Sequence, residues 1–370
     1  MKKVLFLIHD LGQGGAEKVL INLVNHMDCS KFDITVMTLF DYGENRNFLS
    51  PNIKYRSWCK NMFPGNSHLM KLFSPRILHN MIIKEKYDIE VAYLEGPCAR
   101  IISGCPYKTT KLVSWIHIEQ HTAKKIAASF RNINEATKCY NKFNKIVCVS
   151  KEVENDFRKN MQINVPIEVL YNTNDSKKIF YSSQETVKNI DFDKDEFKLV
   201  GVGKLLKNKG FDRILRITNR LIKEGYEIHT YILGEGSERE KLQKYIKEND
   251  LHNQVSLLGY QLNPYRYVAK CDLFVCASYA EGFSTAASEA LILGIPVCTV
   301  EVSGMKEMLG ENNEYGIVVH NDEECLYQGI KFLLSNPDKL AYYRKQAILR
   351  GKMFSTSYTT KAVEKMLLLL

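Results

Sequence analysis

Long apolar runs are missing from this sequence, and their absence excludes a membrane-spanning protein. No stretch approaches the ~20 consecutive apolar residues that a helix needs to cross a bilayer. The apolar run near the start, Val4–Ile8, ends in His9 and Asp10 and is followed by no signal-peptide cleavage site. This run therefore predicts a first β-strand, and we expect the chain to remain in the cytoplasm.

Zinc-binding cysteine patterns are missing as well. The chain has 10 cysteines but no C-x2-C pair and no cysteine–histidine cluster at zinc spacing. Cys148, Cys276 and Cys298 stand inside apolar strand-like patterns, where cysteine behaves as a small hydrophobic residue. We therefore expect reduced and mostly structural cysteines.

Internal repeats and low-complexity segments are also absent, and the sequence instead alternates apolar runs with helix-length segments. Such alternation predicts parallel sheets covered by helices, an α/β fold. The 370 residues are more than one domain with a single hydrophobic core usually contains, so the strands are expected to divide into two sheets. The expected strands lie near residues 4–8, 34–39, 89–94, 111–116, 146–149, 168–170, 198–203, 228–233, 255–258, 273–276, 296–299 and 316–319.

The division between the two domains is predicted from composition. Polar residues and loss of apolar periodicity mark 173–196 as a linker. This linker would separate an N-terminal domain, 1–172, from a C-terminal domain, 197–352. Residues 353–370 predict a final helix, which we expect to pack back toward the N-terminal domain.

Two acids, Glu281 and Glu289, form the most informative motif. An isolated pair at this spacing is usually solvated, but here a buried strand pattern, 272–277, leads into the first acid. Ligands of open α/β sheets bind at such strand ends. A helix beginning just after Gly282 would place Glu289 about two turns along, so that a diphosphate meets free amides while both carboxylates reach hydroxyls beside it. This arrangement suits a nucleotide-sugar.

The segment resembles the E-x7-E signature of retaining glycosyltransferases with the GT-B fold, most closely glycosyltransferase family 4. The likeness covers nearly the whole chain and is greatest to enzymes that build bacterial capsule, exopolysaccharide and lipopolysaccharide core. It implies two Rossmann-like parallel-sheet domains facing a central cleft, of which the N-terminal one binds the acceptor and the C-terminal one binds the nucleotide-sugar. It also implies that Glu281 holds the hydroxyls of the donor sugar and that Glu289 binds the ribose. The donor-binding residues expected between them are Gly282, Phe283, Ser284 and Thr285.

A glycine loop follows the first strand. Glycines there permit a tight turn and close approach of a phosphate to a helix start, although such a loop alone is more often structural. The resemblance implies that Gly14 and Gly15 lie between the domains, beside the donor pyrophosphate. A dinucleotide fingerprint read from Gly12 would need glycine where Glu17 stands, so we do not expect NAD binding.

Two lysines follow the first strand of the C-terminal half. Lys204 and Lys209 would neutralise a leaving nucleoside diphosphate and so stabilise the transition state, although loop lysines are usually solvated. The family commonly has arginine at the position of Lys204. An ammonium group there supplies the charge without the planar two-pronged contact.

His117 ends a predicted strand, and the resemblance implies that it approaches the donor sugar near its reacting carbon. A lone histidine is more often a packed or surface residue, but a strand end in an α/β sheet favours function. Gly259 and Tyr260 follow another predicted strand. The resemblance implies that backbone groups at this turn hold the nucleobase and that Tyr260 lies nearby.

We expect sugar transfer from a UDP-linked donor to a hydroxyl of a growing bacterial glycan. This acceptor is expected to be either a free glycan or a glycan linked to a lipid. The resemblance implies front-face transfer rather than double displacement. Lysines and backbone amides would then neutralise the diphosphate, and no metal or other cofactor is expected. The D-x-D matches in Asp191–Asp195 fall in the linker, so solvated charge is the better interpretation.

Three other functions remain open from the sequence. A nucleotide-sugar 2-epimerase of the same fold would bind the same donor without a second substrate. A catalytically silent relative would act as a stabilising partner. A Rossmann oxidoreductase is disfavoured by the imperfect glycine loop.

The net charge of +9 is concentrated in residues 1–172, which carry +8 of it. The basic stretch 97–151 can bind nucleic acid, but the interleaved Ile126, Ala127, Phe130 and Ile133 fit a helix on an anionic membrane surface better. A solvated helix face is an equally good interpretation. We expect peripheral association with the inner face of the cell membrane and no nucleic acid partner.

Overall fold

The computed structural model describes residues 1–370 except 13, 63–65, 188–189, 191, 193–194 and 282. The chain folds into two compact units. Unit 1 consists of Met1–Asn174 and Thr356–Leu370, and unit 2 consists of Asp175–Ser355. Among the described helices, none combines the length and the apolar composition that crossing a bilayer requires.

Unit 1 is built on a sheet with the strand order β3-β2-β1-β4-β5-β6-β7, in which all described strand pairs are parallel. The strands are β1 (Lys2–Ile8), β2 (Phe32–Phe40), β3 (Lys54–Cys59), β4 (Ile89–Ala92), β5 (Lys111–Ile116), β6 (Lys145–Cys148) and β7 (Ile167–Val169). Val4–Ile8 of β1 is completely buried, as expected for a central strand covered on both faces.

Unit 2 repeats this topology with the order β10-β9-β8-β11-β12-β13, again in parallel. The strands are β8 (Phe197–Val202), β9 (Ile228–Leu233), β10 (Val255–Gly259), β11 (Leu273–Cys276), β12 (Val297–Val300) and β13 (Ile317–Val319). In both units the chain order reverses beside the first strand, which creates a topological switch point where ligands of such sheets bind.

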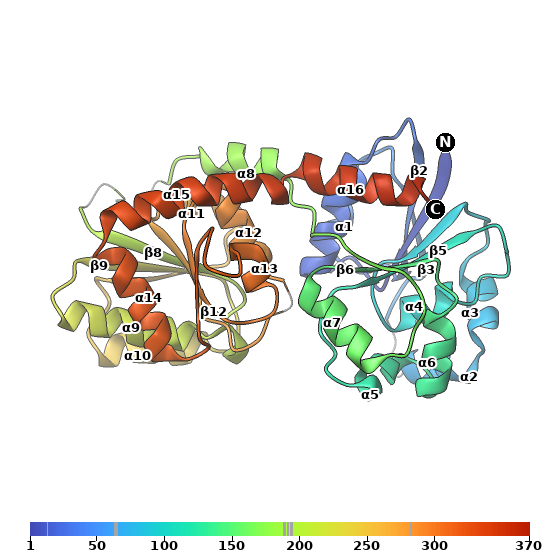
Figure 1. Cartoon of the computed structure of the whole chain (residues 1–370), viewed down its shortest axis with the longest axis horizontal. Helices are drawn as coiled ribbons and strands as arrows, with labels where there is room; N and C mark the ends of the chain where they lie inside the picture. Colours follow the sequence, from blue (N-terminus) through green and yellow to red (C-terminus); the bar gives the residue numbers. More distant parts are fainter. Residues whose placement is uncertain (13, 63–65, 188–189, 191, 193–194, 282) are drawn as a thin grey trace. The chain divides into compact units, whose positions relative to one another are not determined.

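Helices cover both faces of each sheet (Figure 1). In unit 1 they are α1 (Gly15–His26), η1 (Glu44–Phe48), α2 (Asn66–Leu72), α3 (Pro75–Ile82), α4 (Pro97–Ile102), α5 (Ala123–Ile126), η2 (Ala127–Ser129), α6 (Ile133–Tyr140), α7 (Lys151–Asn160) and α16 (Thr356–Leu368). In unit 2 they are α8 (Ser176–Ser183), η3 (Lys207–Lys209), α9 (Phe211–Lys223), α10 (Arg239–Glu248), α11 (Tyr265–Val268), α12 (Thr285–Ile292), α13 (Met305–Leu309), α14 (Glu323–Leu334), α15 (Pro337–Gly351) and η4 (Lys352–Phe354).

The predicted fold class, α/β with two Rossmann-like parallel sheets, is confirmed. β3 was not expected, because its sequence Lys54–Cys59 alternates charged and uncharged residues and forms no continuous apolar run. The segment 173–196, expected as a linker, contains α8. This helix begins after Asp175, whose side chain accepts a hydrogen bond from the Lys178 amide as an N-cap.

The last helix, α16, packs against α1 within unit 1. Lys2 Nζ donates to the Leu367 carbonyl at 3.0 Å, and the Asp28 amide donates to Glu364 Oε1 at 2.6 Å. The helix begins at Thr356 rather than at residue 353, because η4 occupies the preceding turn. These two hydrogen bonds hold the end of the chain against the start of β1 and the turn that follows α1.

Candidate functional site

Within unit 2, the switch point lies between the carboxyl ends of β8 and β11, and two of the predicted residues meet there. Lys209 Nζ lies 2.6 Å from Glu281 Oε1, and the Ser278 hydroxyl donates to the same oxygen at 2.8 Å. The two charged side chains are only 27% and 11% exposed. Partial burial strengthens their attraction relative to a surface pair.

Lys209 is held at this position by the glycine that follows it. Gly210 has φ of +67°, a left-handed conformation, and a Cβ there would lie 2.0 Å from the Ala277 carbonyl oxygen. Only glycine therefore allows η3 to approach the end of β11 so closely. This approach brings the ammonium group of Lys209 to the carboxylate of Glu281.

Glu289 lies on the helix that follows, but in a different position from the one expected. α12 begins at Thr285 with Ser284 as its N-cap, so Glu289 lies just over one turn into the helix rather than two. Its carboxylate is 8% exposed and accepts a hydrogen bond from the Tyr265 hydroxyl at 3.0 Å. The Ser284 hydroxyl accepts from the Ala287 amide, which is the usual capping contact.

The remaining predicted residues of unit 2 occupy the same edge of the sheet. Lys204 is exposed just after β8, and Phe283 is buried before α12. Gly259 ends β10 with φ of +68°, and its carbonyl accepts from the Gly234 amide at 2.8 Å. Tyr260, next in the chain, is 63% exposed. Gly282 lies outside the described residues, as do Asp191 and Asp193 of the acidic run.

The glycine loop of unit 1 follows β1 at the equivalent switch point. Gly14 is the N-cap of α1 and Gly15 is its first residue, so the loop does lead into a helix start. Asp10 organises the loop, because its carboxylate accepts from the Gly12 amide at 2.8 Å and contacts His9 Nδ1 at 2.7 Å. The hydrogen bond from His9 lowers the pKa of Asp10 despite partial burial.

His117 directly follows β5 and is 8% exposed. Burial lowers the pKa of its imidazole to about 4, although a hydrogen bond to the Tyr93 backbone favours the charged form. The ring is therefore neutral near pH 7. Its Nε2 is buried and has no hydrogen-bond partner among the described residues. A buried polar atom without a partner is uncommon and is consistent with a group that awaits a ligand.

Three contact residues of these sites were not predicted from the sequence. Ser278 donates a hydrogen bond to Glu281, and Tyr265 donates one to Glu289. Glu95 accepts a hydrogen bond from the His117 amide at 3.2 Å. Ser278 and Glu95 follow β11 and β4 within three residues, so their proximity to strand ends was a usable signal. Tyr265 lies on a short helix and carried no such signal.

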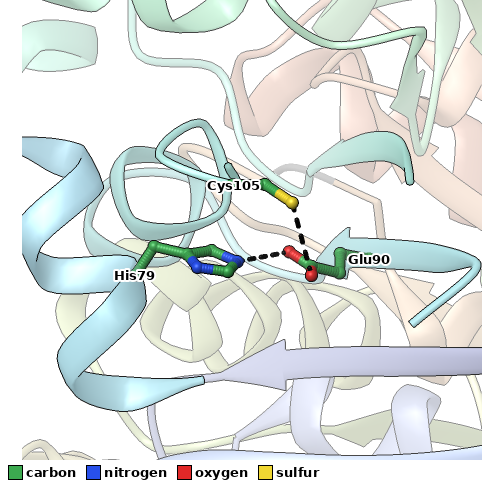
Figure 2. Close-up of side chains that lie close together, drawn as sticks. All are labelled: His79, Glu90 and Cys105. Atoms are coloured by element: carbon green, nitrogen blue, oxygen red, sulfur yellow. Dashed lines mark hydrogen bonds and ion pairs between the residues drawn. The ribbon is translucent and has the colours of Figure 1, made fainter. Parts of the chain in front are cut away.

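A cluster of the buried His79 and Glu90 with the half-buried Cys105 is the one group in the described part of the chain with metal-ligand chemistry and spacing. Figure 2 shows that His79 from α3 and Cys105 both point toward Glu90 on β4, at 2.8 Å and 3.5 Å. A ligating histidine normally donates its other nitrogen to a partner, but His79 Nδ1 has none among the described residues. The cluster is therefore better explained as a buried hydrogen-bonded pair beside a thiol.

The structure buries three of the four apolar residues that suggested a membrane helix in 97–151, and the fourth, Ile133, is 46% exposed at the start of α6. Ile126, Ala127 and Phe130 are at most 7% exposed and belong to the core, and α5 is only four residues long. Arg100 is 1% exposed and is paired with Glu135 at 3.1 Å, because its long side chain reaches into the unit instead of toward solvent.

Comparisons with known proteins match both units to glycosyltransferase families. The family model described as "Glycosyltransferase Family 4" matches residues 13–178, and "Glycosyl transferases group 1" matches residues 182–350. A relative from Campylobacter jejuni is the N-acetylgalactosamine-N,N'-diacetylbacillosaminyl-diphospho-undecaprenol 4-alpha-N-acetylgalactosaminyltransferase. It is 30% identical over 375 residues, which cover 96% of each chain.

Two further matches agree with these. The lipopolysaccharide core biosynthesis glycosyltransferase LpsD of Rhizobium meliloti is 23% identical over 331 residues, covering 89% of this chain and 88% of that one. Among solved structures, the Anabaena protein HepE in complex with UDP has a TM-score of 0.78 at 18% identity and covers all of both chains. At this identity the structural likeness shows the fold alone.

Proposed function

Because the chain belongs to the family 4 glycosyltransferases, we propose that it transfers a sugar from a UDP-linked donor, with retention, to a hydroxyl of a bacterial surface-glycan precursor. The observation that carries the proposal is the Lys209–Glu281 pair at the switch point of unit 2, with Glu289 on the helix that follows. UDP in the HepE complex and the diphospho-undecaprenol acceptor in the name of the Campylobacter relative support this choice of substrates.

The Lys209–Glu281 pair suits an exchange of partners when the donor binds. Sugar hydroxyls would donate to the Glu281 carboxylate, while the Lys209 ammonium would turn to the departing diphosphate. Lys204, exposed at the end of β8, would add a second positive charge. These charges stabilise the transition state more than the ground state, because negative charge grows on the diphosphate as the bond to the sugar breaks.

The glycine loop and His117 are given the remaining roles in this scheme. The amides at Gly14 and Gly15 would face the diphosphate from the start of α1, where the helix dipole favours negative charge. His117 Nε2 would contact the donor sugar, as a neutral group that supplies a hydrogen bond without charge. Front-face transfer needs no enzyme nucleophile, and the diphosphate oxygen accepts the acceptor proton.

A panel of nucleotide-sugars and lipid-linked acceptors tests the proposal, with products measured by mass spectrometry. We expect a glycosylated acceptor, of retained anomeric configuration by NMR, with one donor of the panel. Conversion of the donor without an acceptor would favour a 2-epimerase. Binding of UDP without any turnover would favour a catalytically silent partner, and UDP release without product would show hydrolysis only.

We further propose that unit 1 docks on an anionic membrane surface through the basic residues that were expected, but with other apolar side chains beside them. Leu69 and Leu72 of α2 are 46% and 71% exposed, and Arg131 donates to the Lys71 and Leu72 carbonyls at 2.7 and 2.8 Å. α2 contacts η2, which directly follows α5 with its exposed lysines. The surface thus combines apolar side chains with positive charge, which suits anionic lipid headgroups.

A further inference from the structure

Glu95 lies just beyond the carboxyl end of β4, next to the strand that leads into His117, and the scheme above gives it no role. Its Oε2 accepts a hydrogen bond from the His117 amide at 3.2 Å, and its Oε1 accepts one from Gln120 Nε2 at 3.4 Å. β4 and β5 are neighbours in the sheet. The carboxylate therefore ties the end of one strand to the segment that leaves the next.

The other side of the same segment is held by a second acid. Asp156 on α7 accepts from the Gln120 amide at 2.8 Å and from the His121 amide at 3.1 Å. His121 has φ of +62°, a conformation that costs a non-glycine residue free energy. The segment from His117 to His121 is thus fixed at both ends, by one carboxylate at each.

A hydrogen bond to the Tyr93 backbone also orients the His117 ring, so the direction of Nε2 depends on that contact together with the anchoring of the His117 backbone. The ring packs against Tyr93 with centroids 5.0 Å apart. Because Nε2 has no partner among the described residues, no side chain directs that edge of the ring. Glu95 is buried as well, and burial raises the pKa of its carboxyl group. Hydrogen bonds in such low-dielectric surroundings are strong.

We propose that Glu95 is a positioning residue that fixes the His117 backbone and thereby aims Nε2 at the donor sugar. The inference rests on the proposed function, since it is the sugar that gives Nε2 its partner. Glu95 itself acts through His117 and makes no contact with the substrate.

A double-mutant cycle tests this role. Glu95→Ala should lower kcat by about 10- to 100-fold, the scale of a misplaced catalytic contact, with little change in donor KM. Glu95→Gln should restore most of the activity, because its amide oxygen still accepts from the His117 amide. In a His117→Ala background, Glu95→Ala should have no further effect. Independent losses from the two substitutions, or equal losses in Glu95→Ala and Glu95→Gln, would overturn the proposal in favour of a direct substrate contact.

Amide hydrogen exchange supplies a readout that needs no activity. Exchange at His117 should be faster in Glu95→Ala than in the wild type and unchanged in Glu95→Gln. The matched variant Asp156→Ala should instead speed exchange at Gln120 and His121. Unchanged exchange at His117 in Glu95→Ala overturns the positioning role whatever the donor is. If the wild type transfers no sugar while exchange changes as expected, the proposed function fails and the anchoring of His117 by Glu95 is supported.

Discussion

The two units share a parallel-sheet topology and differ in the chemistry at the ends of their strands. In unit 2 an ammonium group and a carboxylate are ionic partners, with Lys209 and Glu281 2.6 Å apart. In unit 1 burial beyond β4 and β5 works against charge, lowering the pKa of His117 to about 4 and raising that of Glu95. The site of unit 2 is therefore arranged for a charged ligand group, and the surroundings of His117 for neutral hydrogen bonding.

This difference follows from what surrounds each strand end rather than from the strands. After β11 the chain supplies Ser278 and Glu281, and η3 adds Lys209, so each charge has a partner. After β5 the chain supplies His117 between the Tyr93 ring and the Glu95 carboxylate, and no cation pairs with Glu95 in the described contacts. The same fold thus carries two local chemistries, and function has to be argued from each site.

The largest expected effect comes from breaking the ion pair of unit 2. Glu281→Ala should reduce sugar transfer by roughly 10²- to 10³-fold, the scale for loss of one transition-state contact. Product formation at saturating donor is the measurement. Glu324→Ala is the control, because it removes a carboxylate from a surface pair with Arg220 in the same unit. Wild-type turnover in Glu281→Ala would contradict the assignment of this site.

The next effect tests the neutral histidine of unit 1. Because the folded pKa of about 4 lies below the ordinary 6.5, the unfolded chain binds the proton first as pH falls, so stability is lost from about pH 6.5 down to pH 4. Between pH 7 and pH 4.5 the wild type should lose about 2 kcal/mol more unfolding free energy than His117→Gln. Both tryptophans, Trp58 and Trp115, lie in unit 1, so their fluorescence during urea unfolding reports this unit. Parallel losses in both proteins would contradict a buried neutral ring.

The sequence predicted the two sheets well, because central parallel strands are buried on both faces and leave continuous apolar runs. It missed β3, an edge strand with one neighbour, because half-exposed strands leave no such run. The motif residues Lys209 and Glu281 were identified from strand ends, but their ionic contact depends on the approach of Gly210 to Ala277. That approach is a tertiary feature and no local pattern encodes it.

The basic stretch was the least predictable part of the chain. Of the four apolar residues that suggested a membrane helix, Ile126, Ala127 and Phe130 belong to the core and only Ile133 is exposed, since short amphipathic segments look alike in either setting. Arg100 is buried because Glu135 and the Met70 and Phe73 carbonyls satisfy its donors. These partners lie 27 to 35 residues away, which a local reading of charge does not detect.

A smaller effect is expected at Glu289, the second acid of unit 2. Glu289→Gln should raise the donor KM roughly tenfold, equivalent to about 1.4 kcal/mol, with kcat little changed, because ribose is bound equally in the ground and transition states. Tyr265→Phe is the matched variant and should give a smaller rise, since it removes only the hydroxyl that donates to Glu289. A loss confined to kcat would instead place this carboxylate at the reacting centre.

Membrane docking should distinguish the units by a change of roughly 30-fold in vesicle binding. Replacing the exposed Lys124 and Lys125 with glutamine should weaken binding of unit 1 to anionic vesicles, at about 1 kcal/mol per lysine near the surface. Glutamine at Lys241 and Lys244 of α10, which are 72% and 75% exposed, is the control in unit 2. Binding of the wild type should also fall at high salt, since the Debye length drops from ~10 Å at 0.1 M to ~3 Å at 1 M. Equal binding to neutral and anionic vesicles would remove charge as the cause.

The smallest expected effect is that of a chelator, which tests how the protein neutralises the diphosphate. If Lys204, Lys209 and the amides at Gly14 and Gly15 supply the positive charge, excess EDTA should leave most of the transfer rate intact. A Mg²⁺-dependent enzyme needs carboxylates directed at the phosphates, whereas the proposed scheme assigns Glu281 to the sugar hydroxyls and Glu289 to the ribose. Lys209→Ala sharpens the test, because removing the ammonium group should reduce transfer far more than EDTA does. Loss of activity in EDTA that Mg²⁺ or Mn²⁺ restores, together with a mild effect of Lys209→Ala, would shift the neutralising role from lysine to a metal ion.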